Sequence, residues 1–475
     1  MKKLFVVAVV LAIACLSSMA FAAEVTVNGY VDVRSRLFEN LDLNKSMNNA
    51  DTASRTTTET AFRIDVNVKA DNAKAKLSLW NDHDIWGINA KHNADNQRNI
   101  TNEGNGGASA VQGSSAYIRE AWLDVMIPDT PVGVKAGHML TQIGNGWFFR
   151  DNYGGVDAWV VYGKMGNATF AVQDVKLAEG TYPSGAATPV ATMNNTNAND
   201  VDLYTAMAEM KMGDNTLGIN LSMLKDDAGI YLAPQSTTNG AYGSAQTDNV
   251  GTTGMNQKGR LYNVGLNFVG KLGPAAIKAE ADVQQGKVEN SAGAVSGTAN
   301  QIVAQGTMPM GALTLNATAA RGSGNVAGQS PTTAAPFNGK MTQFLDFTDI
   351  GQHYTLLYEY RIKGATGFTN TGFSNTTALE VGGMFQATKS LAVGADLWFL
   401  RATEATNIAL ASGSTNANNS RDLGMELDAK ANWQITKEVS WNWQLGYFKP
   451  GSAYTTNLGK ADDAWGAQGI LSMTF

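Results

Sequence analysis

The side chains with the widest chemical range in this chain are its four histidines. His83 has an aspartate on each side, and His92 follows nearby, so metal-ligand types lie close together in sequence. Successive residues of a strand point to opposite faces, however, so only alternate members of this group can converge on one ion. His138 and His353 lie outside any local arrangement of base and nucleophile. We therefore expect no metal site, no cofactor and no enzymatic activity.

Charged side chains recur instead at alternate positions of segments whose intervening residues are apolar. Bases gather on the polar faces of the first three such segments and of the fifth: Arg34, Arg36, Arg63, Lys69, Lys74, Lys76 and Lys135. Acids dominate the fourth and later segments: Glu120, Asp124, Glu280, Asp282, Glu359, Asp396, Glu426 and Asp428. Two walls of unlike charge across water would orient polar solutes. The alternative is that these charges pair with opposite charges on neighbouring strands and only keep the inner wall hydrated.

The segments that carry these charges have a period of two residues, which indicates strands with one polar and one apolar face. Fifty glycines and only 16% charged residues indicate a turn-rich, all-β chain without long helices. Aromatic residues within or at the ends of the segments predict interfacial girdles: Trp80, Trp86, Trp122, Trp159, Tyr162, Tyr204, Tyr262, Trp398, Trp433, Trp441, Trp443 and Tyr447. We expect a single transmembrane antiparallel up-and-down β-barrel.

The connections between segments alternate between short turns and long polar stretches. We place long loops at residues 39–58, 87–114, 176–200, 226–258, 286–299, 322–340, 402–420 and 450–462. Short periplasmic turns and long extracellular loops are typical of outer-membrane barrels, whereas a soluble sheet has no reason to keep this asymmetry.

The pattern yields 19 candidate strands, but a barrel with both termini on one side needs an even number. The conflict lies between residues 321 and 376. Counting from either end gives the segment 354–362 opposite directions, so either one assigned strand is false, which leaves 18, or a short strand around 342–347 makes 20. We predict 18 strands within a range of 16 to 20, which also agrees with the chain length.

The last segment, 464–475, alternates in polarity and ends on Phe475. It is similar to the closing strand of bacterial outer-membrane β-barrels. That resemblance implies that Phe475 is an assembly signal for the barrel-assembly machinery, and that the barrel lies in the lipid of a Gram-negative outer membrane. A soluble antiparallel sheet is the alternative on this segment alone.

Residues 1–22 have the features of a cleaved secretory signal: two lysines, an apolar run and a cleavage site with small residues. The domain prediction is therefore a signal peptide at 1–22 and one barrel domain at 23–475. Cys15 is the only cysteine, so the mature chain would contain no disulfide, c-type haem attachment or thiolate metal site. A formal net charge of −6 argues against nucleic-acid binding.

Five short runs within residues 60–165 resemble the alginate-export family of outer-membrane barrels and related porin-like channels of metal-reducing bacteria: 79–87, 119–124, 134–139, 144–147 and 154–158. The resemblance implies an 18-stranded barrel that conducts anionic material through a basic constriction. The chain departs from it at His138, where the family commonly has arginine.

The function that we expect is a passive outer-membrane porin for small hydrophilic solutes, including anions. Two alternatives stay open. One is a barrel that encloses or docks a redox protein such as a multihaem cytochrome, and the other is a polysaccharide exporter. The sequence also leaves open whether the chain forms a homo-oligomer.

Overall fold

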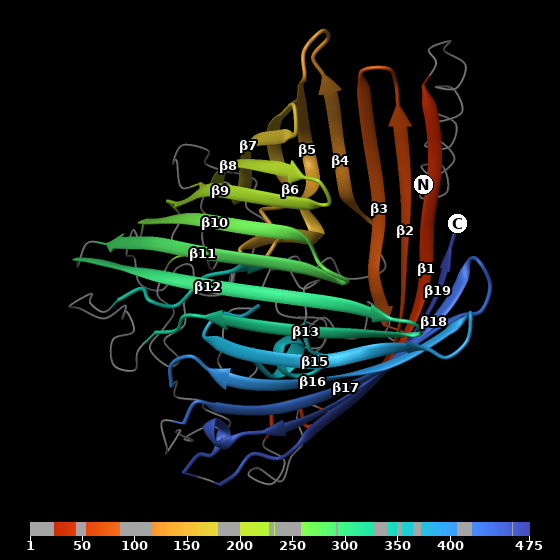
Figure 1. Cartoon of the computed structure of the whole chain (residues 1–475), viewed down its shortest axis with the longest axis vertical. Coiled ribbons are helices and arrows are strands. Elements are labelled where there is room, and N and C mark those ends of the chain that lie inside the picture. Colours follow the sequence, from red (N-terminus) through yellow and green to blue (C-terminus); the bar gives the residue numbers. More distant parts are fainter. Residues whose placement is uncertain are drawn as a thin grey trace, which may run out of the picture.

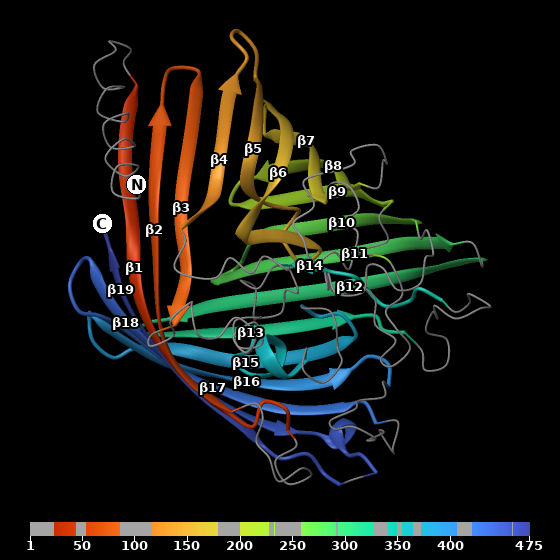
Figure 2. The same cartoon turned by 180° about the vertical axis from the view of Figure 1, so that it is seen from behind.

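Eighteen antiparallel strands close into one β-barrel, as predicted (Figure 1). The computed structural model describes residues 23–43, 54–85, 116–178, 200–227, 232, 258–290, 293–325, 340–348, 354–363, 372–405, 420–457 and 459–475. Each wall strand pairs with its neighbour in sequence, and β1 pairs with β19 from Tyr30 opposite Thr474 to Glu39 opposite Trp465. Figures 1 and 2 show β1 and β19 side by side from both directions.

The wall strands of the first half are β1 (Glu24–Glu39), β2 (Arg55–Lys69), β3 (Ala73–Ile85), β4 (Tyr117–Met126), β5 (Val132–Gln142), β6 (Phe149–Met165), β7 (Ala168–Ala178), β8 (Val201–Met212) and β9 (Asn215–Asp226). Those of the second half are β10 (Lys258–Leu272), β11 (Ala275–Asn290), β12 (Gly293–Met310), β13 (Leu313–Gly322), β15 (Thr376–Gln386), β16 (Leu391–Ala402), β17 (Asp422–Gln434), β18 (Val439–Pro450) and β19 (Ala464–Thr474). A 3₁₀ turn, η4 (Ser452–Tyr454), follows β18.

The outer face of the wall is apolar over the middle of the strands. Exposed side chains there include Val27, Leu221, Leu266 and Leu445, while polar residues at the alternate positions point inward. Such a closed barrel satisfies every ladder hydrogen bond internally, which a lipid environment requires. No helix in the described part of the chain is long and apolar enough to cross a membrane. The apolar outer belt and the polar interior are the features of a transmembrane β-barrel.

The C-terminal residue closes the barrel. Phe475 accepts a hydrogen bond at its carbonyl from the Gly29 amide at 3.0 Å and donates its own amide to the Gly29 carbonyl at 3.1 Å. The phenyl ring lies exposed on the outer face. Phe475 is therefore the end of the closing strand, and its role as an assembly signal stays a prediction.

The conflict between residues 321 and 376 resolves in favour of 18 strands. Residues 354–362 do not form a strand: they contain a π-helical turn, η3 (Tyr358–Ile362), inside the barrel (Figure 2). The two-residue strand β14 (Phe347–Thr348) also lies inside, where it pairs in parallel with the start of β6. Neither element belongs to the wall.

One predicted loop is wrong. Residues 286–299 are largely strand, because β11 continues to Asn290 and β12 starts at Gly293. The alternation reverses here: Lys287 and Glu289 form an ion pair on the exposed side, while Val288 and Val295 are buried inside. This hairpin extends beyond the apolar belt, so its outer face is polar and resembles a loop in sequence.

The aromatic girdle is confirmed for only some of the predicted residues. Trp159, Tyr204, Tyr262, Trp433, Trp441 and Tyr447 are exposed on the outer face. Trp80 and Trp398 are buried inside instead. Their alternate position in the strand turns them inward, and Trp86 lies outside the described residues.

Candidate functional site in the lumen

The connection between β5 and β6 folds into the barrel and reaches β11, five strands further along the wall. The connection comprises residues 143–148. Gly144 and Gly146 in it adopt positive φ angles of 56° and 84°, which tighten the turn. The Glu280 side chain of β11 accepts hydrogen bonds from the backbone amides of Asn145 and, at 3.1 Å, Trp147. We call residues 143–148 the first inward segment.

Further bonds from separate strands hold the first inward segment. The Asn145 side chain donates to the carbonyl of Ala279 at 2.7 Å, and Gln301 of β12 donates to the carbonyl of Trp147 at 3.2 Å. The Phe347 amide of β14 donates to the carbonyl of Phe148 at 2.7 Å. The segment is thus attached at several independent points.

Residues 354–363 form a second inward segment with a similar attachment. The Glu426 carboxylate of β17 accepts hydrogen bonds from the backbone amides of Leu357 at 2.6 Å and Tyr358 at 2.8 Å. Asp428 accepts a longer bond from the Leu356 amide at 3.3 Å. Glu426 is fully buried, so these bonds form away from water, where an unpaired charge would be costly.

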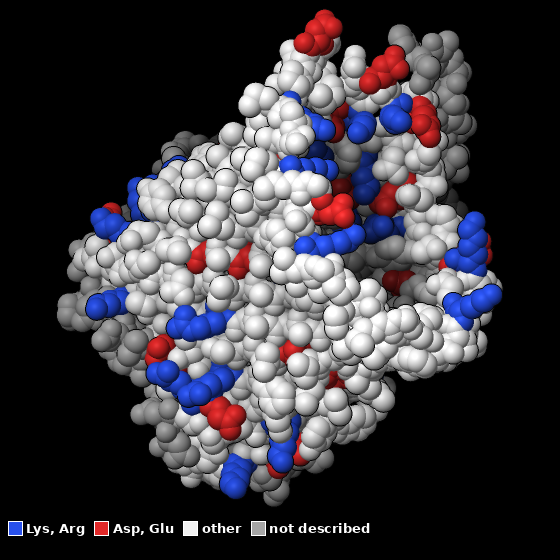
Figure 3. Space-filling model, viewed as in Figure 1, with Lys and Arg blue, Asp and Glu red and all other residues white. Residues whose placement is uncertain are grey.

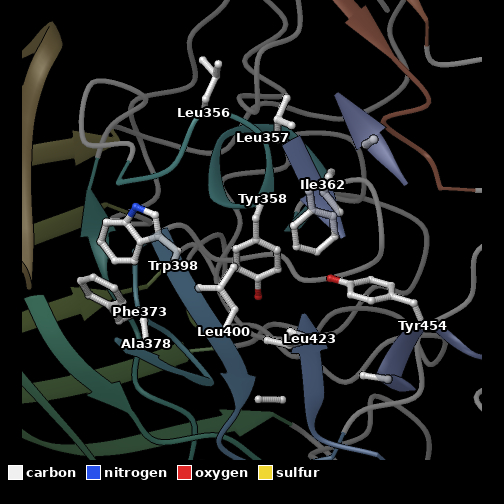
Figure 4. Close-up of a cluster of buried hydrophobic side chains, with 14 of the residues drawn as sticks. Leu356, Leu357, Tyr358, Ile362, Phe373, Ala378, Trp398, Leu400, Leu423 and Tyr454 are labelled. Carbon is white, nitrogen blue, oxygen red and sulfur yellow. The ribbon is translucent and has the colours of Figure 1, made fainter. Parts of the chain in front are cut away.

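Apolar side chains pack the second inward segment against the wall. Figure 4 shows Tyr358 between Trp398 and Phe373 on one side and Tyr454 on the other. Leu357, Tyr358 and Ile362 are fully buried in this cluster. A second cluster surrounds the first inward segment through Ile143, Phe148 and Phe344. Together the two segments and their clusters occupy part of the lumen.

Burial also affects the one lysine of the second inward segment. Lys363 is almost completely buried and donates a hydrogen bond from Nζ to the carbonyl of Gly372 at 2.7 Å. Burial lowers the pKa of Lys363 from its ordinary 10.5 to about 8, and the nearby Asp346 and Glu359 oppose this shift. The Gly372 amide in turn donates to Glu359 at 3.0 Å.

The wall from β1 to β5 carries a network of charges. Lys76 Nζ lies 2.6 Å from Glu120 and 3.8 Å from Asp65. Arg63 Nε lies 3.0 Å from the same Asp65. On the neighbouring strand, the Lys135 ammonium lies 3.9 Å from the centre of the Trp122 ring. Lys and Arg side chains gather in the hollow beside β1 to β5 (Figure 3).

All twelve residues predicted to line a pore are described and fall on inward positions of their strands. Arg36 is buried against Glu59, Asp124 accepts a bond from the Tyr162 hydroxyl at 2.6 Å, and Asp396 pairs with Lys430. Within the described residues, no ion pair joins four of the seven bases to a carboxylate: Arg34, Lys69, Lys74 and Lys135. Glu426 and Asp428 hold the second inward segment. Whether the twelve residues border the path of a solute stays a prediction.

His138 lies on the outer face, not in the lumen. Its Nδ1 is 2.9 Å from Asp157, which is largely exposed, and its Nε2 is 2.8 Å from the carbonyl of Gly154. The other histidines cannot be placed against the predicted chemistry. The side chain of His83, and all of His92 and His353, lie outside the described residues, as does the predicted signal peptide.

Sequence reasoning missed both inward segments. The pattern Glu-x-Asp occurs at Glu280 with Asp282 and again at Glu426 with Asp428, each pair on one strand face. We expected these acids to form a wetted wall. The available signal was the Gly144-Asn145-Gly146 run, which interrupts strand alternation between two strong strands.

Comparisons with known proteins agree on the fold. Two crystal structures from Pseudomonas aeruginosa superpose on nearly the whole chain. OccK11 (OpdR) has a TM-score of 0.50 and 8% sequence identity, with 95% of this chain and 96% of that chain covered. OccK2 (OpdF) also has a TM-score of 0.50, with 10% identity and coverage of 94% and 97%. No protein-family model matches the chain. A search of curated proteins also found no match.

Proposed function

We propose that this barrel is a passive channel for small hydrophilic solutes and that it favours anions. The observation that carries the proposal is the unpaired positive charge on the lumen wall of β1 to β5. Arg34, Lys74 and Lys135 face inward, and none of them has an ion pair with another described residue. Unpaired charge beside a water-filled path raises the local concentration of the opposite ion.

The inward segments support a path for small solutes. A barrel of 18 strands is wide enough for an aqueous channel unless internal segments narrow it. Here Glu280 and Glu426 hold two segments inside the lumen. A narrowed lumen favours small solutes over a polymer or an enclosed protein. The resemblance to the alginate-export family, the cytochrome partner and the homo-oligomer stay predictions.

The test is single-channel recording of the purified protein in a planar bilayer under a salt gradient. We expect ohmic current steps and a reversal potential of the anion-selective sign. Replacing three bases together (Lys74→Gln, Lys135→Gln and Arg34→Gln) should shift the reversal potential towards the value expected for a cation-selective channel. Lys437→Gln, in the exposed turn between β17 and β18, is the matched control and should leave it unchanged.

Three results would contradict the proposal. Cation selectivity of the unmodified barrel would contradict the preference for anions. An unchanged reversal potential in the triple variant would remove the β1 to β5 wall as its cause. A folded barrel without current would instead favour the redox sheath or a closed exporter.

A further inference from the structure

A second polar region lies in the lumen on the side opposite the β1 to β5 wall. It is a cavity of about 440 Å³ that β11, β12, β13, β15, β16 and β17 line, together with Tyr354 of the second inward segment. Its titratable lining residues are Lys278, Glu380, Asp396, Lys430 and Tyr354. Two positive and two negative side chains thus border one cavity.

The negative side chains gather at one end. Asn316 of β13 donates hydrogen bonds to Glu380 and, at 3.0 Å, to Asp396, so it holds both carboxylates together. Lys430 pairs with Asp396 only. Two carboxylates with one ion-paired lysine leave this end with an excess of negative charge, and Asp428 adds to the negative field at Asp396.

The positive side chain at the other end is Lys278 of β11. No ion pair joins Lys278 to any residue that the structure describes. Arg150, at the base of the first inward segment, adds positive field at Lys278. Glu280 reduces this field, but its carboxylate already accepts the two backbone bonds of the first inward segment. This end of the cavity is therefore positive.

The two ends are separated by a distance that suits a small molecule. β11 and β15 are three ladder steps apart in the wall, through β12 and β13, which is roughly 14 Å between backbones. Lys278, Gln305, Thr318 and Glu380 are in register on the inward face of these four strands, so Gln305 and Thr318 lie between the two charged residues. Amides and hydroxyls border this interval: Gln305, Thr307, Asn316 and Thr318.

An apolar surface completes the cavity. Tyr354 and Trp398 both line it, and their rings lie 5.1 Å apart between centres. Aromatic faces of this kind contact the carbon chain of a solute while the charged ends bind its ionic groups.

We infer that this cavity is a binding site for zwitterions that carry both a carboxylate and an ammonium group, such as amino acids with separated charges. Lys278 binds the carboxylate, Glu380 and Asp396 bind the ammonium group, and Tyr354 with Trp398 contacts the carbons between them. The inference rests on the proposed function, since it adds a class of solute to the same channel. A net-neutral solute would not be attracted by the basic wall alone.

Calorimetric titration of the folded barrel in detergent tests the site without requiring conduction. The titrants are γ-aminobutyrate, butyrate and n-butylammonium, which share a short carbon chain and differ in charge. We expect γ-aminobutyrate to bind about tenfold more tightly than either singly charged molecule, because only it can use both ends of the cavity. Equal binding of butyrate and γ-aminobutyrate would overturn the inference in favour of a plain anion site.

Two variants identify the ends. Lys278→Met and Glu380→Gln should each weaken γ-aminobutyrate binding about tenfold. In Lys278→Met, γ-aminobutyrate should bind no more tightly than n-butylammonium, and in Glu380→Gln it should bind no more tightly than butyrate. Lys271→Met, at the exposed end of β10, should bind like the unmodified protein. Heat-modifiable migration on gels verifies that each variant is folded. Unchanged binding in either cavity variant would exclude that residue from the site and overturn the inference.

Bilayer recording separates this inference from the proposed function. With γ-aminobutyrate present, we expect brief interruptions of the open current that shorten in both cavity variants. Normal current without binding or interruptions would overturn the zwitterion site and leave the channel intact. Calorimetric binding by a folded barrel that conducts nothing would overturn the channel function and support the site.

Discussion

The two inward segments are held by the same kind of contact but depend on it to different degrees. In each, one wall glutamate accepts hydrogen bonds from two backbone amides: Glu280 for residues 143–148, and Glu426 for residues 354–363. Gln301 and Phe347 also bond the first segment. The second is held by its glutamate, a longer bond to Asp428, two bonds with Gly372 and the packing of its apolar cluster.

This difference shows two ways in which a barrel wall can fix a segment inside its lumen. The segment 143–148 buries Ile143, Trp147 and Phe148 in the apolar clusters, and polar bonds from several strands also fix its position. A longer connection can bring its own apolar surface, so one buried carboxylate is sufficient to align its backbone. The second segment should therefore be the easier one to release by a single substitution.

The largest effect should come from Glu426→Gln. This change keeps the size of the side chain but removes its charge and replaces one acceptor by an amide that cannot accept the facing N–H. Two charge-assisted bonds are weakened, so the docked segment should lose about 3 to 6 kcal/mol. We expect larger and noisier single-channel currents.

Glu438→Gln, in the exposed turn after β17, is the matched control for that substitution. It should leave the current unchanged. If Glu426→Gln gave the same quiet current as the control in a folded barrel, the apolar cluster alone would hold the second segment.

Glu280→Gln should have a smaller effect on the current. It weakens the same number of backbone bonds, but Gln301, the Asn145 side chain and β14 still hold the first segment. Combining Glu280→Gln with Gln301→Ala removes bonds from two strands and should approach the effect of Glu426→Gln. Currents that are larger for Glu280→Gln than for Glu426→Gln would reverse the comparison.

The sequence predicts the wall of this barrel far better than its interior. Alternation in segments such as 62–70 reflects a local rule, because each strand has one face to lipid and one to water. The attachment of the inward segments has no local rule, since Asn145 and Glu280 are 135 residues apart. The buried Glu426 looks in sequence like any other polar lumen residue. Only the folded barrel distinguishes a carboxylate that holds a backbone from one that faces water.

The smallest effect should be a dependence on pH that Lys363 gives to the second segment. Lys363 has a folded pKa of about 8, below its ordinary 10.5, so between these values the unfolded segment binds more protons than the docked one. The docked state is therefore stabilised as pH rises from 8 towards 10.5 and destabilised as pH falls through that range.

Current noise recorded from pH 7.5 to 10 should accordingly decrease with rising pH in the unmodified barrel. Lys363→Met removes this titrating group and should flatten the part of the dependence that follows its pKa. Glu280→Gln, which affects only the first segment, should retain it. If Lys363→Met kept the full dependence, the titration would belong to other groups, and the two segments would differ in their anchors alone.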